Sequence, residues 1–221
     1  MLVATVAHSP RFGGKVKSFD ATAVKAIPGV VEVVQISRGV AVVAQNTWAA
    51  IKGREALQIV WDNSGAETRS SEALFKEFEG LAKQDGKIAL QRGDAAAKLD
   101  KARTTIEATY RFPYLAHAAM EPLNAVVHKD GDRLHIHGGL QMPDVVQSTC
   151  AQIAGVKPEQ VDLHVMKTGG GFGRRAVADS DVFVEATEIA KALDFRAPTL
   201  PRGQRRHCHS VTSRTPPPSA L

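Results

Sequence analysis

The stretch of sequence that decides the fold is VDLHVMKTGGGFGRR, residues 161–175. Its first six residues alternate between apolar and polar side chains, which predicts a half-buried β-strand. Four of the five residues 169–173 are glycine, so the backbone there can turn sharply and approach a ligand closely. A new apolar pattern with the spacing of a helix begins near Ala178. The sequence therefore predicts a strand, a glycine-rich loop and a helix in succession.

The glycine loop has two interpretations. Backbone amides of such a loop can face an anion, and the helix N-terminus together with the guanidinium groups of Arg174 and Arg175 would favour negative charge. The alternative is a tight turn that carries two surface arginines. Neither common nucleotide motif is present, because the phosphate loop of NTPases ends in Gly-Lys-Ser/Thr and the dinucleotide fingerprint requires glycine where Arg174 stands.

Other elements follow from periodicity and turn residues. In the first half we expect strands at Leu2–His8, Gly29–Ile36, Val40–Ala44 and Leu57–Trp61. Helices are expected at Trp48–Ala56, capped by Thr47, and at Ser71–Lys83, whereas residues 86–100 are expected to be mostly loop. In the second half we expect a strand at Thr105–Phe112, a hairpin of Asn124–His128 with Arg133–His137, and a helix over Asp144–Ala154 ended by Gly155.

Composition and charge narrow the class of protein. Of 221 residues, 43% are hydrophobic and 23% charged, which is typical of a globular protein and excludes wholesale disorder or a fibre. No apolar run is long enough to span a membrane.

The net charge of +5 lies mainly in residues 194–221, which carry five arginines and one aspartate. We expect this segment to be a disordered basic tail. Nucleic-acid binding by the tail is an alternative, but we expect no nucleic-acid partner.

Cysteine and histidine residues do not form a recognisable metal motif. Cys150 and Cys208 cannot hold an iron–sulfur cluster or a tetrathiolate zinc ion, and Cys150 is expected to be a small core residue. His135 and His137 share one side of a strand but lack a third ligand, so we expect a surface or packed pair. Structural roles are expected for His117 and Glu121, and the run at 207–209 is interpreted as incidental. We therefore expect no metal held by the chain's own side chains.

Three motifs occur in a fixed order: YLAHAAMEPLN at residues 114–124, QMP at 141–143 and GGGFGRR at 169–175. Together they resemble the molybdenum-binding large subunit of the xanthine dehydrogenase/aldehyde oxidase family, in particular the branch that contains the isoquinoline 1-oxidoreductase β-subunit. The resemblance implies an α+β (mixed α/β) fold. It places a partial a/b hammerhead domain at 1–64, a linker with one amphipathic helix at 65–104 and the start of a molybdopterin-binding domain at 105–193, followed by the tail at 194–221.

The resemblance also implies a function. Members of this family oxidise an aldehyde or an N-heterocycle with water-derived oxygen on a molybdenum–pterin (molybdopterin) cofactor, and electrons leave through 2Fe–2S clusters. In this branch the clusters lie on a separate iron–sulfur small subunit, so none is expected in this chain. The residues that match cofactor-binding positions, or directly follow them, are Gln141, Gly169, Gly170, Gly171, Phe172, Gly173 and Arg174. Met120 and Glu121 match the active-site wall less specifically.

Several departures from the family limit these expectations. The family's catalytic glutamate has no counterpart here, so no catalytic residue is assigned and we expect an inactive N-terminal fragment. The family pattern is expected to end at Leu193, and the Arg- and Pro-rich sequence beyond it resembles a frameshifted translation.

The alternative function is a non-catalytic module that binds an anion or phosphorylated metabolite through Gly169–Arg175. With no signal peptide visible we expect a cytoplasmic location, and a periplasmic one stays open if an export signal precedes residue 1.

Overall fold

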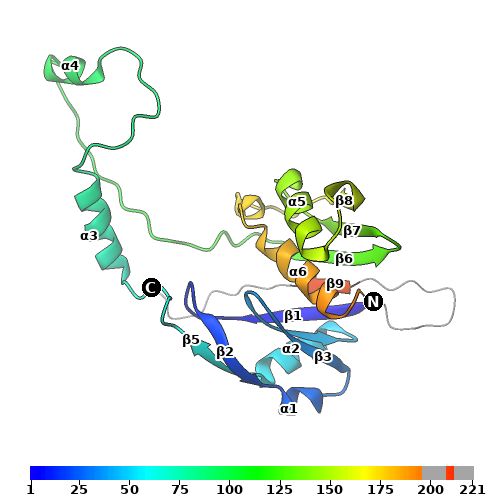
Figure 1. Cartoon of the computed structure of the whole chain (residues 1–221). Coiled ribbons are helices and arrows are strands. Elements are labelled where there is room, and N and C mark those ends of the chain that lie inside the picture. The colour runs from blue at the N-terminus through cyan, green and yellow to red at the C-terminus, as the bar shows by residue number, and fades with distance from the viewer. Residues whose placement is uncertain (196–207, 212–221) are drawn as a thin grey trace. The chain divides into compact units, whose positions relative to one another are not determined.

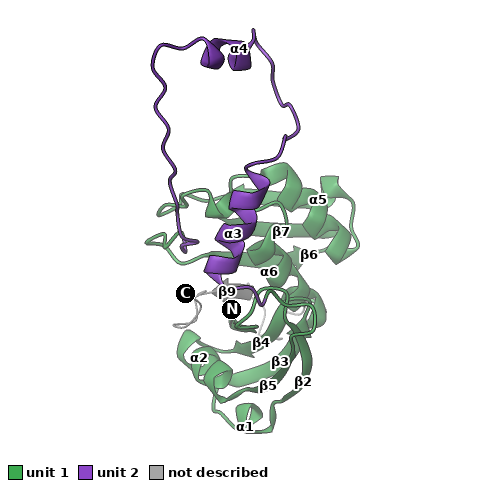
Figure 2. Ribbon diagram, turned by 90° about the vertical axis from the view of Figure 1, so that its left-hand side faces the viewer, with its two compact units in different colours: residues 1–67, 117–218 green, residues 68–116, 219–221 purple. Residues whose placement is uncertain are grey.

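The computed structural model describes residues 1–195 and 208–211 (Figure 1). The chain divides into two compact units (Figure 2). Unit 1 comprises residues 1–67 and 117–218, and unit 2 comprises residues 68–116 and 219–221. None of the helices in the described part of the chain is long and apolar enough to cross a membrane. Helices and strands are mixed throughout unit 1, which confirms the predicted α+β class.

Unit 1 is built on a seven-stranded sheet in the order β3-β4-β1-β9-β6-β7-β8. Its strands are β1 (Leu2–His8), β3 (Val30–Ile36), β4 (Gly39–Ala44), β6 (Asn124–Asp130), β7 (Arg133–Gly138), β8 (Val161–Val165) and β9 (Cys208–Val211). The first group, β3-β4-β1, is antiparallel. In the second group β6 and β7 form an antiparallel hairpin and β8 lies parallel to β7. A separate two-stranded sheet pairs β2 (Lys15–Asp20) with β5 (Gln58–Asp62).

The helices of unit 1 are α1 (Thr22–Lys25), α2 (Thr47–Ala56), α5 (Pro143–Ala154) and α6 (Asp181–Ala192), with 3₁₀ turns η1 (Pro158–Gln160) and η2 (Arg174–Ala176). Helix α2 ends at Ala56 as predicted, but Thr47 is its first residue and not its cap. The cap is Asn46, whose side chain accepts a hydrogen bond of 2.9 Å from the Ala49 amide. Asparagine is at least as good an N-cap as threonine, so the helix begins one residue earlier than predicted.

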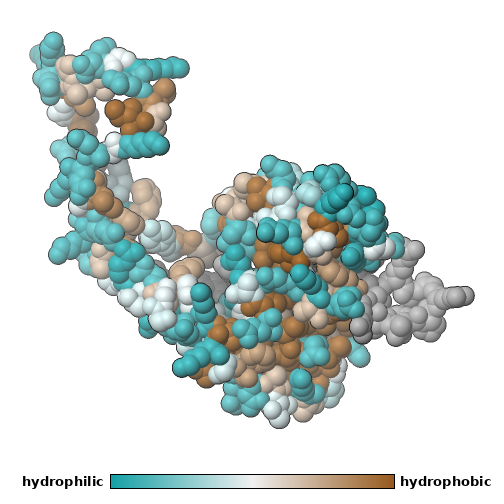
Figure 3. Space-filling model, viewed as in Figure 1, coloured by the Kyte–Doolittle hydropathy of each residue, from teal (hydrophilic) through white to brown (hydrophobic). Residues whose placement is uncertain are grey.

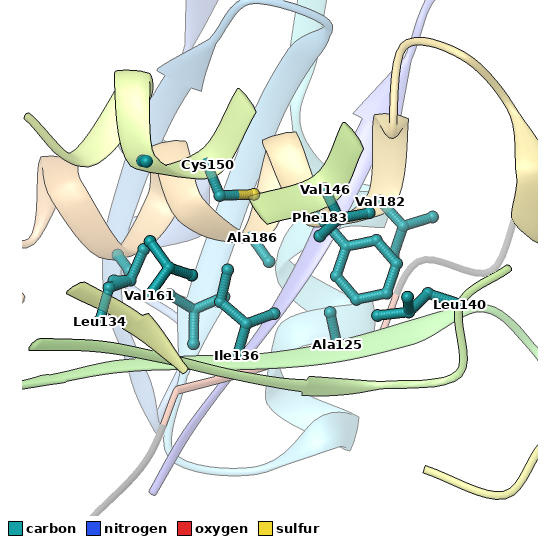
Figure 4. Close-up of a cluster of buried hydrophobic side chains, with 13 residues drawn as sticks. Ala125, Leu134, Ile136, Leu140, Val146, Cys150, Val161, Val182, Phe183 and Ala186 are labelled. Carbon is teal, nitrogen blue, oxygen red and sulfur yellow. The ribbon is translucent and has the colours of Figure 1, made fainter. Parts of the chain in front are cut away.

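The main core lies between helices α5 and α6 and the strands β6, β7 and β8 (Figure 4). Alternate residues of the hairpin point into it, and Leu134 and Ile136 are fully buried there. Cys150 of α5 packs in the same cluster, which confirms its prediction as a core residue. Gly155 ends α5 with φ 71°, as predicted for a left-handed residue after a helix. This core fixes the positions of the loops that leave β7 and β8.

Helix α6 also contacts the first half of the chain. Ile189 packs with the apolar side chains of β1 and β4, in a second buried cluster. The carboxylate of Glu185, itself buried, lies 2.9 Å from the His8 ring. The Ser37 hydroxyl donates to Glu188 at 2.9 Å, and the Arg38 guanidinium lies 2.8 Å from Asp179. Helix α6 therefore packs in both buried clusters, the main core beside β6, β7 and β8 and the second cluster beside β1 and β4.

The tail prediction is wrong for residues 208–211. The sequence predicts disorder over 194–221, but residues 208–211 form β9, parallel to β1 and antiparallel to β6. Strands β1 and β6 would otherwise each present an edge of unpaired backbone N–H and C=O groups. A ladder between backbones does not require apolar side chains, so the composition of this segment is a poor guide to it. Residues 196–207 and 212–221 lie outside the described part of the chain.

Unit 2 differs from its predicted structure in two respects. Residues 105–112 form no strand, although their side chains alternate, and Ile106, Tyr110 and Phe112 are exposed. Helix α3 (Ser71–Leu81) forms nearly as predicted, but none of its residues is buried. A short helix α4 (Ala95–Asp100) interrupts the expected loop. No residue from 68 to 116 is buried, and in Figure 3 hydrophobic residues are scattered among hydrophilic ones along this part of the chain.

Candidate functional site

The structure brings the three sequence motifs together around the glycine loop, residues 169–173. A Cβ at Gly169 would lie 2.7 Å from the Cβ of Glu121, and one at Gly171 would lie 3.3 Å from the Gln141 Oε1. The Gln141 amide donates to the carbonyl of Arg175 at 3.2 Å, just before α5 begins. The loop therefore runs closely between Glu121 and Gln141, and larger side chains at Gly169 or Gly171 would crowd both neighbours. Sequence spacing alone could not show this contact.

The carbonyl groups of the loop are held from the protein side. Four of its five carbonyl oxygens accept hydrogen bonds from flanking segments. The donors are the Glu121 amide to Gly169 at 3.3 Å, the Arg175 Nε to Gly170 at 2.9 Å, the Arg174 amide to Gly171 at 2.9 Å and the Ala176 amide to Gly173 at 3.0 Å. These hydrogen bonds restrain the loop backbone with four of its carbonyl groups directed toward the protein.

The amides of the loop have the opposite arrangement. The N–H groups of residues 170–173 donate to no group among the described residues, and most of the loop is exposed. Positive φ angles of 96° at Gly170, 51° at Phe172 and 86° at Gly173 give the loop this conformation. Successive free amides of this kind form a concave set of donors for electronegative ligand atoms. The loop can therefore bind a negatively polarised ligand without a charged side chain.

Phe172 has an unusual backbone conformation for a bulky residue. Its φ of 51° lies in the left-handed region, and the residue is 77% exposed. A non-glycine residue in this region costs on the order of 1–3 kcal/mol and persists where surrounding contacts impose it. Here the imposing contacts are the carbonyl hydrogen bonds of Gly171 and Gly173 on either side. The aromatic ring is thereby presented to solvent beside the free amides.

Glu121 is a structural partner of the loop. Its carboxylate accepts hydrogen bonds from the Gly169 amide and from the Asn124 side chain, and it lies 3.2 Å from the Arg175 guanidinium. The Gly169 hydrogen bond, followed by those from Asn124 and the charge of Arg175, lowers the pKa of Glu121 below its ordinary value. The group is therefore ionised at neutral pH and already engaged, which makes it a poor proton acceptor.

The two arginines differ from the prediction that they face an anion. Arg174 makes a two-point ion pair with Asp181, with N–O distances of 3.1 and 2.6 Å. The Arg175 side chain is only 2% exposed and bonds to backbone carbonyls. Asp181 also accepts from the Val182 amide and so occupies the N-terminus of α6. Both arginines turn inward because the carbonyls and the carboxylate on the protein side need donors.

The histidine pair of β7 belongs to a larger cluster. His135 and His137 stack with His128 of β6 and His164 of β8, at ring-centroid distances of 4.1 to 5.8 Å. The rings are nearly parallel, and the Nε2 of His164 lies 3.5 Å from the Nδ1 of His135. No group of three or more His, Cys, Asp or Glu side chains in the described ranges could hold a metal ion. The pair is packed within the cluster, and the third and fourth histidines come from strands that sequence spacing could not align.

Comparison with known protein families identifies the class. Residues 80–212 match the family described as the molybdopterin cofactor-binding domain. The match covers more than half of the chain, so the chain belongs to this family, and the resemblance to molybdenum-binding subunits of xanthine dehydrogenase/aldehyde oxidase type is confirmed. The match reaches residue 212, so the expectation that the family pattern ends at Leu193 is wrong. Strand β9 lies within this last stretch.

Individual relatives agree with the family. The chain is 29% identical over 208 residues to the β-subunit of isoquinoline 1-oxidoreductase from Brevundimonas diminuta, covering 87% of this chain and 26% of that protein. It is 26% identical over 196 residues to the aldehyde oxidoreductase molybdenum-binding subunit PaoC of Escherichia coli K12, covering 78% of this chain and 27% of that protein. The chain thus spans about a quarter of the length of these relatives.

Solved structures show the same fold. Quinoline 2-oxidoreductase from Pseudomonas putida 86 matches with a TM-score of 0.66 and 17% identity, over 95% of this chain and 30% of that one. The Cu,Mo-CO dehydrogenase matches with a TM-score of 0.65 and 18% identity, over 97% of this chain and 32% of that one. At these identities the likeness concerns the fold alone, and it agrees with the α+β class.

Proposed function

We propose that this chain supplies part of a molybdopterin-binding site in an oxidoreductase of the xanthine dehydrogenase/aldehyde oxidase type. The observation that carries the proposal is the row of free amides at residues 170–173, which lies next to Gln141 in a chain that belongs to the molybdopterin cofactor-binding domain family. On this proposal residues 105–193 begin the cofactor-binding domain, and residues 1–64 are part of an a/b hammerhead domain.

The residues present fit such a cofactor. Its pterin, dithiolene and phosphate groups offer electronegative oxygen, nitrogen and sulfur atoms. The loop offers neutral donors, and the Glu121 carboxylate beside it is already hydrogen-bonded to the protein. Amides at residues 170–173 would hold these atoms, and the exposed carboxamide of Gln141 would add a further neutral donor. Arg174 would act through its pair with Asp181, which fixes the end of the loop. When bound, the cofactor supplies oxidation of an aldehyde or N-heterocycle with water-derived oxygen.

Partners and substrate follow from the same proposal. Two relatives are named as subunits of larger enzymes, one of isoquinoline 1-oxidoreductase and one of nicotinate dehydrogenase. We propose an iron–sulfur small subunit with 2Fe–2S clusters as the electron acceptor. The 221 residues alone are proposed to be inactive, since Glu121 is hydrogen-bonded and ionised and no other acidic side chain contacts the loop in the described residues.

The alternative function is a binding module for an anion or a phosphorylated metabolite. The same amides could donate to phosphate oxygens. The structure disfavours this function because Arg174 and Arg175, which would supply the positive charge, are engaged with Asp181 and with backbone carbonyls. Titration with inorganic phosphate, followed by thermal unfolding, separates the two functions, since a phosphate site predicts saturable stabilisation.

The direct test is titration of the purified 221-residue chain with molybdopterin under anaerobic conditions, followed by pterin fluorescence. We expect saturable binding, and we expect Gly170→Val to weaken it about tenfold or more because a β-branched side chain cannot hold φ 96° or leave the amides accessible. Gly65→Val is the matched control, since Gly65 has open space around it and lies outside the site. Absence of saturable binding to the wild-type chain, or equal binding by both variants, would contradict the proposal.

A further inference from the structure

Arg175 contacts all three of the motifs that meet at the site. Its Nε donates to the Gly170 carbonyl at 2.9 Å and its Nη1 to the Gly139 carbonyl at 3.2 Å. Its Nη2 donates to the Glu121 carbonyl at 3.4 Å and lies 3.2 Å from the Glu121 carboxylate. Its own carbonyl accepts from the Gln141 amide. The side chain is 2% exposed, so a planar group with five donors sits inside the protein among backbone acceptors.

This geometry has a direct consequence for the loop. A peptide group that points its carbonyl inward must point its N–H in the opposite direction. Because Arg175 holds the Gly170 carbonyl on the protein side, the amide of the next residue, Gly171, faces outward. The Glu121 carboxylate, held by the same guanidinium, fixes the Gly169 amide at the start of the loop. Arg175 therefore determines where the row of free amides begins and which way it faces.

We propose that Arg175 is a positioning residue, which holds the glycine loop with its amides toward the ligand and does not itself bind the ligand. The inference rests on the proposed function for its biological meaning, but the loop geometry can be tested without any cofactor. It opposes the expectation that both arginines are anion ligands, because each Arg175 nitrogen that an anion would need already donates to a carbonyl or carboxylate of the protein.

The guanidinium shape is essential to this role. Lysine carries the same charge, but its single ammonium group cannot reach three separate carbonyls in a fixed fork. Loss of hydrogen bonds from a buried charged group leaves acceptors unpaired, and the segments that they belong to should open more readily. The effect should be local, since Gly139, Gly170 and Glu121 all lie in loops around the site and the main core does not include them.

The test is amide hydrogen exchange on the cofactor-free 221-residue chain, in the wild type and in Arg175→Ala and Arg175→Lys. We expect exchange of the two hydrogen-bonded amides of the loop segment, those of Gly169 and Arg174, to become about ten- to a hundredfold faster in both variants, with β6, β7 and α5 little changed. Millimolar guanidinium chloride should restore protection to Arg175→Ala by refilling the cavity, whereas methylammonium should not. Arg133→Ala is the control, because Arg133 is an exposed arginine paired with Asp162, and guanidinium should have no effect on it.

The outcomes are distinguishable. Unchanged loop exchange in Arg175→Ala, or full protection in Arg175→Lys, would overturn the proposal, the latter because charge alone would then suffice. If Arg175→Ala does not fold, the comparison of Arg175→Lys with wild type decides in the same way. Molybdopterin titration adds a separate result. A chain that binds no cofactor but loses loop protection in both variants contradicts the proposed function and leaves the role of Arg175 in the loop supported.

Discussion

At the scale of a single residue, Cys150 gives the protein a measurable pH dependence. Burial raises the pKa of its thiol from 9.0 to about 11. The unfolded chain therefore loses this proton at a lower pH than the folded chain, and the contribution to stability is complete below pH 9 and falls as the pH rises toward 11. The loss should be about 1.4 kcal/mol per pH unit in that window. Urea unfolding of wild type and Cys150→Ala between about pH 8 and 11 measures it, and a constant difference between them would contradict the prediction.

Ser180 shows how one residue can be poorly suited to its own position. It precedes α6 with φ 48° and ψ 35°, it is 4% exposed, and its hydroxyl makes no hydrogen bond to the described residues. Ser180→Gly removes the left-handed strain and the unsatisfied hydroxyl together, so we expect it to stabilise unit 1 by about 1 kcal/mol. Ser148→Gly, in the interior of α5, should destabilise by a similar amount. Urea unfolding of both variants measures this, and destabilisation by Ser180→Gly would show that its hydroxyl has a partner, such as an ordered water.

At the scale of an element, helix α5 ends where its sequence dictates. Gly155 has φ 71° and its amide closes the last turn on the Ala151 and Gln152 carbonyls. Gly155→Ala keeps these bonds but forces a Cβ into the left-handed region, so we expect a loss of about 1 kcal/mol of stability. Gly65→Ala is the control, since Gly65 is not in the left-handed region and a Cβ added there would meet no atom within 4 Å, and it should be neutral or slightly stabilising. Chemical unfolding of the two variants makes the comparison, and equal stabilities would contradict this account of the cap.

Elements with local signals could be predicted and elements that depend on a distant partner could not. The β6–β7 hairpin follows from alternation around Asp130 to Arg133, and Gly131 takes the positive φ that such a turn requires. Residues 105–112 have equal alternation but form no strand. Alternation shows which side chains favour burial, whereas a strand also needs a neighbouring backbone. Strand β9 is the converse case, in which two open edges order a segment that has no apolar pattern.

At the scale of the whole molecule, the residues of the candidate site could be proposed from the sequence, but their hydrogen-bond and ion-pair partners could not. The resemblance to the family, carried by three motifs in order, predicts that Gln141 and the glycine loop contact one ligand, and the structure places the two side by side. The inward direction of both arginines could not be predicted, because it depends on which carbonyls the fold leaves without donors. Sequence places Arg174 and Arg175 next to the loop, and only packing shows that Asp181 and Gly139 compete with any anion for them.

Helix α6 contributes side chains to both buried cores of unit 1, so we expect the unit to unfold as one cooperative structure. Ile189 packs against β1 and β4, while Phe183 and Ala186 on the same helix pack against the core of β6–β8. Ile189→Ala should therefore cost about 2–5 kcal/mol, and the loss should appear in both halves at once. Native-state hydrogen exchange measures this as equal falls in the opening free energy of β4 and of β7. Val146→Ala, which removes apolar atoms from the main core alone, should give the same pattern in an all-or-none unit. A fall confined to β4 in Ile189→Ala would show instead that the two cores open independently.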